Sequence, residues 1–203
     1  MTTDTRYPRE QDLGRTELGD VGEVHKADIR VEAFADCEAA NAAIGHALCL
    51  GGYSVEEARL LTSLQNDLFD LAADLSAPLG QDLDPEPVRI TDAHVTWVQR
   101  AHEHYRTDLT PVDGFVLPGG TLAASLLFQA RIAVRRAERT ILRAMDEHPG
   151  AINPLSPTYL NSVSSLLFAL ARSHNAEHGD TVWRPLASVT PPVEEPSTAS
   201  ATG

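Results

Sequence analysis

Three arginines in one stretch of the sequence have a spacing that suits an anion site. Arg131, Arg135 and Arg139 recur every four residues, so in a helix they form one stripe on which each adjacent pair repels by about 0.2–0.5 kcal/mol. A negative partner is therefore expected beside them. One interpretation is a solvated face relieved by Glu138 or by acids of a neighbouring helix. The other is a clamp for a phosphate or carboxylate, which the planar guanidinium group binds through two parallel hydrogen bonds.

The segment that precedes these arginines is apolar and ends in a turn. It reads FVLPGG from Phe115 to Gly120 and lies at the start of a predicted helix. Taken alone, it is typical of a turn with a hydrophobic staple. Alternatively, Gly119 and Gly120 leave the amide groups of the helix N-terminus accessible to a ligand.

The histidines offer weaker candidates for chemistry. His174 and His178 have the spacing of a metal-binding pair, but the helix that would hold them is expected to end near His174. His102 and His104 would point to different faces of a helix. We therefore predict no metal ligands in the chain.

Five stretches with helical periodicity must position these residues. Apolar residues recur in them at three- to four-residue spacing, and glycines, prolines and capping residues such as Ser54 and Thr91 mark their ends. On the second stretch, a polar face could serve a subunit interface or meet solvent; it consists of Gln65, Asn66, Asp67 and Asp70. The predicted helices span residues 31–50, 54–75, 91–105, 122–147 and 158–174.

These elements predict an all-α fold, an up-and-down five-helix bundle over residues 31–185. No strand pattern and no internal repeat emerges, and 203 residues with 42% apolar residues suit one domain. Residues 1–30 lack apolar periodicity and are expected to be a tail or loop. Residues 186–203 are rich in Pro, Ser, Thr and Ala and are expected to be disordered.

Charge and composition exclude several classes of function. Sixteen basic and twenty-nine acidic residues give a net charge of −13, which opposes binding to nucleic acid. No apolar run approaches the ~20 residues of a membrane span and no signal sequence is evident, so we expect a cytoplasmic protein. Cys37 and Cys49 lie twelve residues apart in one predicted helix, about 18 Å at 1.5 Å per residue, too far for a disulfide.

The apolar segment and the arginine stripe together resemble a known signature. FVLPGGTLAASLLFQARIAVRRAER, residues 115–139, closely resembles that of PduO-type ATP:cob(I)alamin adenosyltransferases. The resemblance continues through ADCEAANAAIGHAL, LQNDLFDLAADLSAP and YLNSVSSLLFALAR to VWRP, covering about residues 7–185. It implies a five-helix bundle that assembles as a homotrimer with an active site at each subunit interface.

The reaction that this resemblance implies uses ATP, Mg²⁺ and a reduced corrinoid (cobalamin). Cobalt(I) attacks C5′ of the ribose, and triphosphate leaves. An N-terminal glycine-rich loop and basic residues hold ATP, while the corrinoid lies in an apolar cavity. The partners are therefore small molecules, with a reductase or an adenosylcobalamin-dependent enzyme as further candidates.

The resemblance also implies roles for individual residues on the corrinoid side. Phe115 would push away the lower axial ligand, because a bulky apolar ring excludes a donor atom, and the four-coordinate cobalt(II) that results is easier to reduce. Arg135 would form an inter-subunit ion pair near the corrinoid with Glu38, which stands in the acidic DELN motif of the family.

On the nucleotide side, the resemblance assigns Arg139 to the polyphosphate, Lys26 to the phosphates and Asn161 to the asparagine of the NRLSD motif. The remaining residues expected to bind the small molecules match the loop motif TRTGDxGxTxL or belong to FVLPGG: Arg9, Asp12, Gly14, Thr16, Gly119 and Gly120.

The nucleotide loop departs from the family pattern at two positions. Glu10 and Gln11 stand where the family has a threonine and a glycine. A carboxylate about 4 Å from a phosphate costs roughly 1 kcal/mol even at water-like screening, so weakened ATP binding is predicted. This departure motivates an alternative function, a non-catalytic or repurposed paralogue that binds a corrinoid or another ligand in the same pocket.

Overall fold

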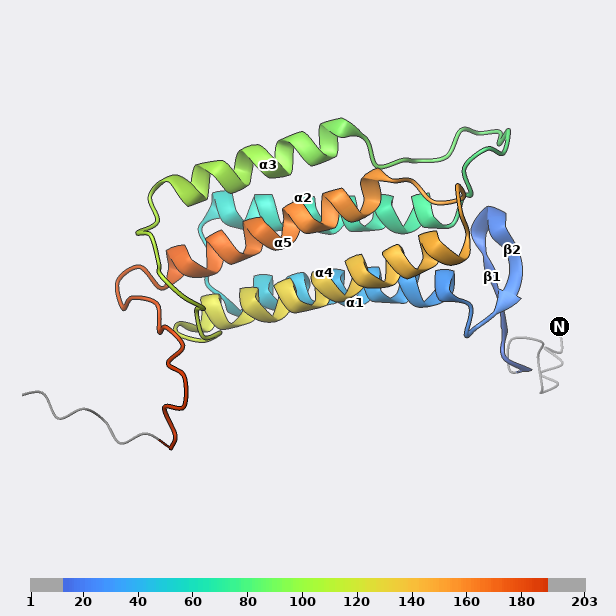
Figure 1. Ribbon diagram of the computed structural model, residues 1–203. Helices are drawn as coiled ribbons and strands as arrows, with labels where there is room; N and C mark the ends of the chain where they lie inside the picture. Colours follow the sequence, from blue (N-terminus) through green and yellow to red (C-terminus); the bar gives the residue numbers. More distant parts are fainter. Residues whose placement is uncertain (1–12, 190–203) are drawn as a thin grey trace, which may run out of the picture.

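The structure, a computed structural model, describes residues 13–189. Consecutive helices run in opposite directions, as the predicted up-and-down bundle requires (Figure 1). No helix in this range is both long enough and apolar enough to cross a membrane. The five helices are α1 (Ile29–Leu50), α2 (Val55–Leu75), α3 (Asp92–Thr107), α4 (Leu122–Glu147) and α5 (Leu155–His174).

Helix α4 occupies the centre of the packing. It packs against α1 on one side and α5 on the other, while α2 packs on α1 and α3 packs on α5. Every helix turns an apolar stripe inward, which is the spacing seen in the sequence. The largest fully buried side chains include Ile44, Leu64, Leu127, Ile141, Tyr159 and Leu167.

Helix ends follow the capping residues of the sequence, with one exception. Ser54 and Glu57 form the predicted capping box, with Glu57 N–H donating to Ser54 Oγ (3.2 Å) and Ser54 N–H to Glu57 Oε2 (2.8 Å). Helix α5 begins at Leu155, three residues before the predicted start. Pro157 is tolerated there because an amide in the first helical turn needs no partner.

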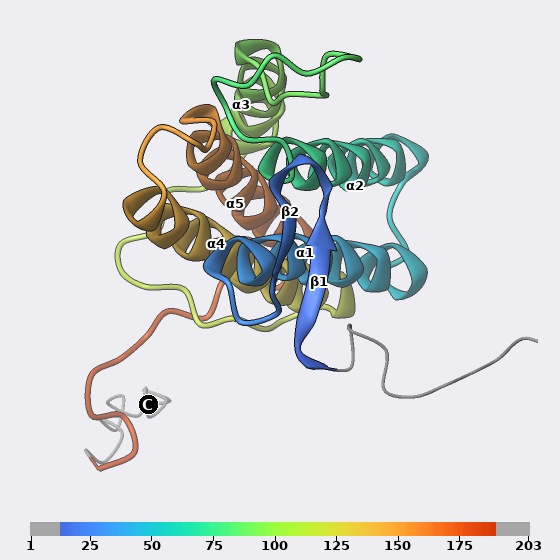
Figure 2. The same cartoon turned by 90° about the vertical axis from the view of Figure 1, so that its right-hand side faces the viewer.

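The prediction of an all-α fold without strands is wrong for the N-terminal region. Two strands, β1 (Arg15–Leu18) and β2 (Gly22–His25), pair antiparallel around the short 3-10 turn η2 (Gly19–Val21). We call residues 14–26, which comprise β1, η2, β2 and one flanking residue at each end, the hairpin. Figure 2 shows it across one end of the bundle. Each strand offers a single buried apolar side chain, Leu18 or Val24, too few to give a period-two pattern in sequence.

Two residues of the polar face of α2, Gln65 and Asp67, form hydrogen bonds within the bundle. The sequence alone predicted that this face would lie at a subunit interface or in solvent. Trp97 Nε1 and the Tyr159 hydroxyl both donate to Asp67 Oδ2, at 2.9 and 3.0 Å. Gln65 Nε2 donates to Asn41 Oδ1 at 2.8 Å. These bonds connect α2 to α3, α5 and α1, so they help to set the register of the bundle.

Both cysteines are free thiols, as predicted from their spacing. Burial raises the pKa of the Cys37 thiol to about 12. The thiol therefore stays protonated at neutral pH and packs as a small apolar group.

Candidate active site

The Phe115 ring projects from a segment that is paired with the C-terminal part of the chain. Val116 and Val182 form an antiparallel bridge, Trp183 N–H donates to the Phe115 carbonyl (2.7 Å), and Leu117 N–H donates to the Thr181 carbonyl (2.8 Å). The Phe115 side chain is nevertheless 75% exposed and meets the Trp183 ring edge to face at 6.1 Å between centroids. The backbone holds a large apolar ring at the surface.

The two glycines after this segment form a turn that Asn175 holds. Asn175 Nδ2 donates to the Gly119 carbonyl (2.9 Å), and Thr121 N–H donates to Asn175 Oδ1 (3.0 Å). A Cβ at Gly120, where φ is +97°, would lie 2.2 Å from Asn175 Oδ1, so only glycine fits there.

The start of α4 is correspondingly less open to a ligand than one interpretation of the sequence suggests. Besides the Thr121 amide, the Ala124 amide is occupied, because it donates to Thr121 Oγ1 at 3.2 Å. The structure therefore favours the turn for this segment over a helix N-terminus whose amide groups are free.

An apolar hollow opens beside the turn. Its volume is about 290 Å³, and two of its walls, Leu122 and Ile132, are large apolar side chains that are 60% and 56% exposed. Apolar surface of this kind on a folded chain marks a ligand site or a contact with another chain. The lining residues are Pro118, Gly119, Leu122, Ser125, Leu126, Phe128, Gln129 and Ile132.

Arg131 is the most enclosed member of the arginine stripe. Its guanidinium lies 5.1 Å from the centre of the Phe168 ring, and within residues 13–189 its buried Nε has no hydrogen-bond partner. Burial, with a smaller contribution from the charge of Arg135, lowers the pKa of Arg131. A cation with an unused donor is suited to receive an anionic ligand.

Arg135 and Arg139 are exposed and form no ion pair within residues 13–189. Their one mutual contact is internal to the helix, since Arg139 Nη1 donates to the Arg135 carbonyl at 2.9 Å. Acids of α1 do pair with α4, but with a different row of arginines: Asp36 with Arg136 (2.8 Å) and Glu32 with Arg143 (2.7 Å). Relief by a neighbouring helix of the same chain is thus not observed for the stripe.

Glu38 is exposed on α1 and forms no ion pair with Arg135 among the described residues. The nearby acid of α1 that does meet α4 is Asp36, two residues before the motif, whose second oxygen accepts from Thr140 Oγ1 at 2.7 Å. The pairing of Glu38 with Arg135 between subunits remains a prediction.

The hairpin brings together three of the residues expected to bind ATP. Lys26 N–H donates to the Gly14 carbonyl at 2.7 Å, Gly14 has φ of +84°, and Thr16 pairs with Val24 in the adjacent register. The Lys26 side chain is exposed. The sites expected at Arg9 and Asp12 lie outside the described residues, as do Glu10 and Gln11.

Arg139 and Asn161 lie at one level of the bundle. Arg131 of α4 contacts Phe168 of α5, and the two helices are antiparallel (Figure 1). Arg139 lies eight residues after Arg131, about 12 Å along α4, and Asn161 lies seven residues before Phe168, a similar distance in the same direction. Asn161 is exposed, and its backbone carbonyl accepts from Ser165 Oγ at 3.1 Å. These two side chains are therefore displaced from Phe115 toward the hairpin end.

One chain does not bring the two halves of the expected site together. The hairpin lies beyond the C-terminal end of α4 (Figure 1). Phe115 instead precedes the first residue of α4, Leu122, which lines the apolar hollow. Helix α4 has 26 residues, a length of about 39 Å. A small molecule cannot touch both ends of one bundle at once.

A separate group of Asp67, Asp70 and His94 has ligand atoms within 4.8 Å of one another. Thr91 N–H donates to His94 Nδ1 at 3.1 Å, so in the neutral imidazole the proton sits on Nε2, which faces Asp70 at 3.8 Å. The Nε2 lone pair is then not available to a metal ion. This group serves the packing of α3 on α2.

Comparison with known proteins identifies the family of this site. The sequence profile described as "Cobalamin adenosyltransferase" matches residues 6–174. The chain belongs to the cobalamin adenosyltransferase family. It is similar to the corrinoid adenosyltransferase of Mycobacterium tuberculosis, with 44% identity over 179 residues that span 88% of this chain and 92% of the relative. The corrinoid adenosyltransferase of Bacillus subtilis is 33% identical over 177 residues, 85% of this chain and 88% of the relative.

Solved structures of the cobalamin adenosyltransferase family share the fold. A variant of the PduO-type ATP:corrinoid adenosyltransferase from Lactobacillus reuteri, complexed with cobalamin and ATP, matches with a TM-score of 0.78 and 29% identity, covering 88% of this chain and 98% of that one. Another variant of the same enzyme, complexed with ATP, matches with a TM-score of 0.76 and 28% identity, over 88% and 99% of the two chains. These relatives support the enzyme over the non-catalytic paralogue.

The structure adds residues to the family motifs that sequence reasoning did not assign. Asn175 fixes the FVLPGG turn and Trp183 packs on Phe115, yet both lie more than fifty residues away in sequence. The signal that could have found Trp183 is the VWRP segment, which contributes to the resemblance. Asn175 carries no comparable motif.

Proposed function

We propose that this chain transfers the adenosyl group of ATP to the cobalt of a reduced corrinoid, giving an adenosylated corrinoid and triphosphate. The observation that carries this proposal is the exposed Phe115 ring, which backbone pairing holds at the surface in the segment that leads to an apolar hollow lined by Pro118 and Gly119. Family membership supplies the reaction, and the geometry supplies the residues for it.

On the corrinoid side, the Phe115 ring would exclude a ligand from the position below the cobalt. An apolar ring offers no lone pair, so it favours the four-coordinate cobalt(II) that is easier to reduce. The electron must come from a separate donor, a reductase in the cell. The cobalt(I) electron pair then forms the bond to C5′ of the ribose, and the bond between C5′ and the triphosphate oxygen breaks.

On the nucleotide side, cationic groups would compensate the charge of the triphosphate as it leaves. Lys26 and Arg139 are exposed donors, and Arg131 contributes a guanidinium with an unused Nε–H. Gly14 and Thr16 in the hairpin and Asn161 on α5 complete the set. Mg²⁺ would enter with ATP, because it binds phosphate oxygens and retains much of its water shell.

We further propose that the site forms between subunits of a cytoplasmic homotrimer. The separation of the hairpin from Phe115 along α4 supports this arrangement, because a second chain can bring its hairpin end to the Phe115 end of the first (Figure 1). The unpaired Arg135 and Glu38 of each chain would then form an ion pair across the interface. Sedimentation should show a trimer, and a stable monomer at micromolar concentration would contradict this part of the proposal.

The activity is tested with cobalamin reduced chemically in the presence of Mg·ATP. We expect absorbance changes of cobalt–carbon bond formation, with one triphosphate released per bond formed. Omission of ATP serves as the control. Corrinoid binding without bond formation or triphosphate release would contradict the proposal and support the non-catalytic paralogue.

A further inference from the structure

The hairpin is attached to α2 through one carbonyl group. The amides of Asp20 and Val21 both donate to the Ser76 carbonyl, at 2.8 and 3.3 Å. Within residues 13–189 these are its only hydrogen bonds to helices α2–α5 or the loops between them. Together with the buried side chains of Leu18 and Val24, this carbonyl therefore helps to fix the position of the hairpin.

The contact at Ser76 is close as well as hydrogen-bonded. Gly19 has φ of +46°, and a Cβ there would lie 2.8 Å from both Cβ and the carbonyl oxygen of Ser76. Such a distance is below van der Waals contact, so the hairpin turn lies directly against Ser76. Any added atom at Gly19 would push the turn away.

Ser76 is itself fixed at the end of α2. Its amide donates to the Ala72 carbonyl at 3.2 Å, and its Oγ donates to the same carbonyl at 2.9 Å. Two bonds to one acceptor leave little freedom to the last helical turn.

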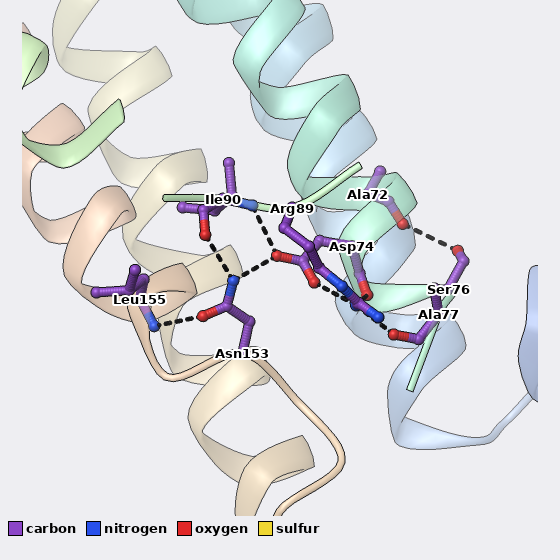
Figure 3. Close-up of polar contacts among 8 residues, drawn as sticks. All are labelled: Ala72, Asp74, Ser76, Ala77, Arg89, Ile90, Asn153 and Leu155. Atoms are coloured by element: carbon purple, nitrogen blue, oxygen red, sulfur yellow. Dashed lines mark hydrogen bonds and ion pairs between the residues drawn. The ribbon is translucent and has the colours of Figure 1, made fainter. Parts of the chain in front are cut away.

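Arg89, from the loop between α2 and α3, bonds on both sides of Ser76 (Figure 3). Its Nη1 donates to the Asp74 carbonyl at 3.1 Å and to the Ala77 carbonyl, and it also pairs with Asp74 Oδ1 at 2.6 Å. The guanidinium therefore holds backbone carbonyls on both sides of Ser76, two residues before it and one residue after it.

Asp74 is the centre of this arrangement and is only 3% exposed. Its Oδ2 accepts from the Ile90 amide (2.8 Å) and from Asn153 Nδ2 (2.7 Å), and Asn153 Nδ2 also donates to the Ile90 carbonyl at 2.7 Å. A buried carboxylate with every neighbour in good geometry fixes positions more than it adds stability.

We propose that Arg89 and Asp74 are positioning residues for the nucleotide, acting through the Ser76 carbonyl on the hairpin that carries Gly14, Thr16 and Lys26. This inference rests on the proposed function of the hairpin in ATP binding. Neither residue touches the ligand. Their loss should weaken ATP binding and leave corrinoid binding unchanged, since neither residue lines the apolar hollow and Phe115 is held by its own contacts with Trp183.

Two variants disrupt the attachment from opposite sides. Arg89→Met removes the bonds that flank Ser76, whereas Gly19→Ala introduces a Cβ against Ser76 and leaves the Arg89 network intact. Trp97→Phe is the matched control. It removes a partly buried hydrogen bond from α3 to Asp67, which lies on α2 as Asp74 does, but Trp97 forms no hydrogen bond to the hairpin. Arg89→Lys tests rescue by a shorter cation.

In both variants we expect amide exchange of Asp20 and Val21 to accelerate, and KM for ATP to rise about tenfold, as loss of one or two hydrogen bonds predicts. Corrinoid affinity and kcat should stay near the values of the natural protein. For Arg89→Lys, amide exchange and KM for ATP should lie between those of the natural protein and those of Arg89→Met. Trp97→Phe should leave exchange at Asp20 and KM for ATP unchanged even where it lowers Tm.

The inference is overturned if Arg89→Met and Gly19→Ala change neither amide exchange in the hairpin nor KM for ATP beyond the change in Trp97→Phe. If Arg89→Met does not fold, Gly19→Ala alone decides by the same two readouts. A natural protein without turnover would refute the proposed function instead, and ATP affinity measured by calorimetry would then replace KM in this comparison.

Discussion

The two ends of the bundle are built in different ways, although each supplies half of the proposed site. At the Phe115 end, strand-like pairing, the Asn175 turn and a ring contact hold the segment before α4. At the other end, a hairpin with one buried side chain per strand lies against a single carbonyl of α2. The corrinoid end is preorganised within one chain, whereas the nucleotide end has few internal restraints.

This difference indicates where substitutions can accumulate without loss of the fold. The departures Glu10 and Gln11 belong to the loop that leads into the weakly attached hairpin, while FVLPGG keeps the pattern of the family. A segment whose attachment depends on few contacts can change with little effect on stability. The changes should then appear in ligand binding.

The largest expected effect is at Phe115. If the ring excludes the lower axial ligand, Phe115→Ala should abolish the spectroscopic signal of four-coordinate cobalt(II), yet leave corrinoid binding within roughly tenfold, or about 1.4 kcal/mol. Electron paramagnetic resonance of bound cob(II)alamin with Mg·ATP measures this directly. A variant that retains the signal would show that the corrinoid end does not depend on this ring.

The next effect tests how firmly the Phe115 end is built. Gly120→Ala combines an unfavourable backbone conformation with a collision at Asn175, so it should lower the free energy of unfolding by about 2–3 kcal/mol. Gly179→Ala is the matched control, since φ there is +77° but no atom lies within 4 Å of the added Cβ; it should cost about 1 kcal/mol. Equal losses in urea unfolding would mean that Asn175 does not hold the turn.

A smaller effect, of opposite sign, is expected in the nucleotide loop. Glu10→Thr with Gln11→Gly removes one repulsion and restores a flexible backbone, each worth about 1 kcal/mol, so ATP should bind roughly ten- to thirtyfold more tightly. Lys26→Ala in this repaired loop should weaken ATP again, because Lys26 is the only lysine of the chain. Calorimetry in which the natural protein binds ATP tightly and neither change matters would remove the case for a weakened loop.

The smallest effect concerns the junction between hairpin and α1. Hydrogen bonds from the Arg30 side chain lower the pKa of Asp28 from 3.8 to about 2. Because the folded-state pKa is depressed, this stability is present above pH 4 and is lost as pH falls from about 4 to 2. The pair is partly exposed, so the contribution is below about 1 kcal/mol.

Asp28→Asn isolates this charge, because asparagine caps a helix as well as aspartate does. The difference in unfolding free energy between the natural protein and the variant should disappear near pH 2. A difference that stays constant between pH 7 and pH 2 would show that the cap, and not the charge, is what matters.

Sequence predicted the helices well because their signals are local. Ser54 and Glu57, for example, form a capping box within four residues of sequence, and the apolar stripes need only the helical period. The hairpin was missed because its stability comes from contact with Ser76, sixty residues away, rather than from its own pattern. The predicted start of α5 was too late, because Pro157 has the appearance of a helix boundary, although proline is tolerated in the first turn.

Candidate site residues could be named from sequence where a contiguous motif contains them. Phe115, Arg135 and Arg139 belong to such motifs and are exposed in the structure, and their roles in binding remain predictions. Nothing local in the sequence indicates that Asn175 and Arg89 hold the two ends. That the halves of the site lie about 39 Å apart along α4 follows only from the direction of each helix.

Complementation between two inactive variants would show whether the active site is shared between chains. Phe115→Ala chains and chains with Thr16→Ala and Lys26→Ala are co-expressed with different tags, and the mixed oligomers are isolated through both tags and assayed for adenosyl transfer. If each site takes its hairpin from one chain and Phe115 from the next, every mixed trimer, of either composition, should contain one active site out of three. Activity no greater than the sum of the two separate variants would contradict the account.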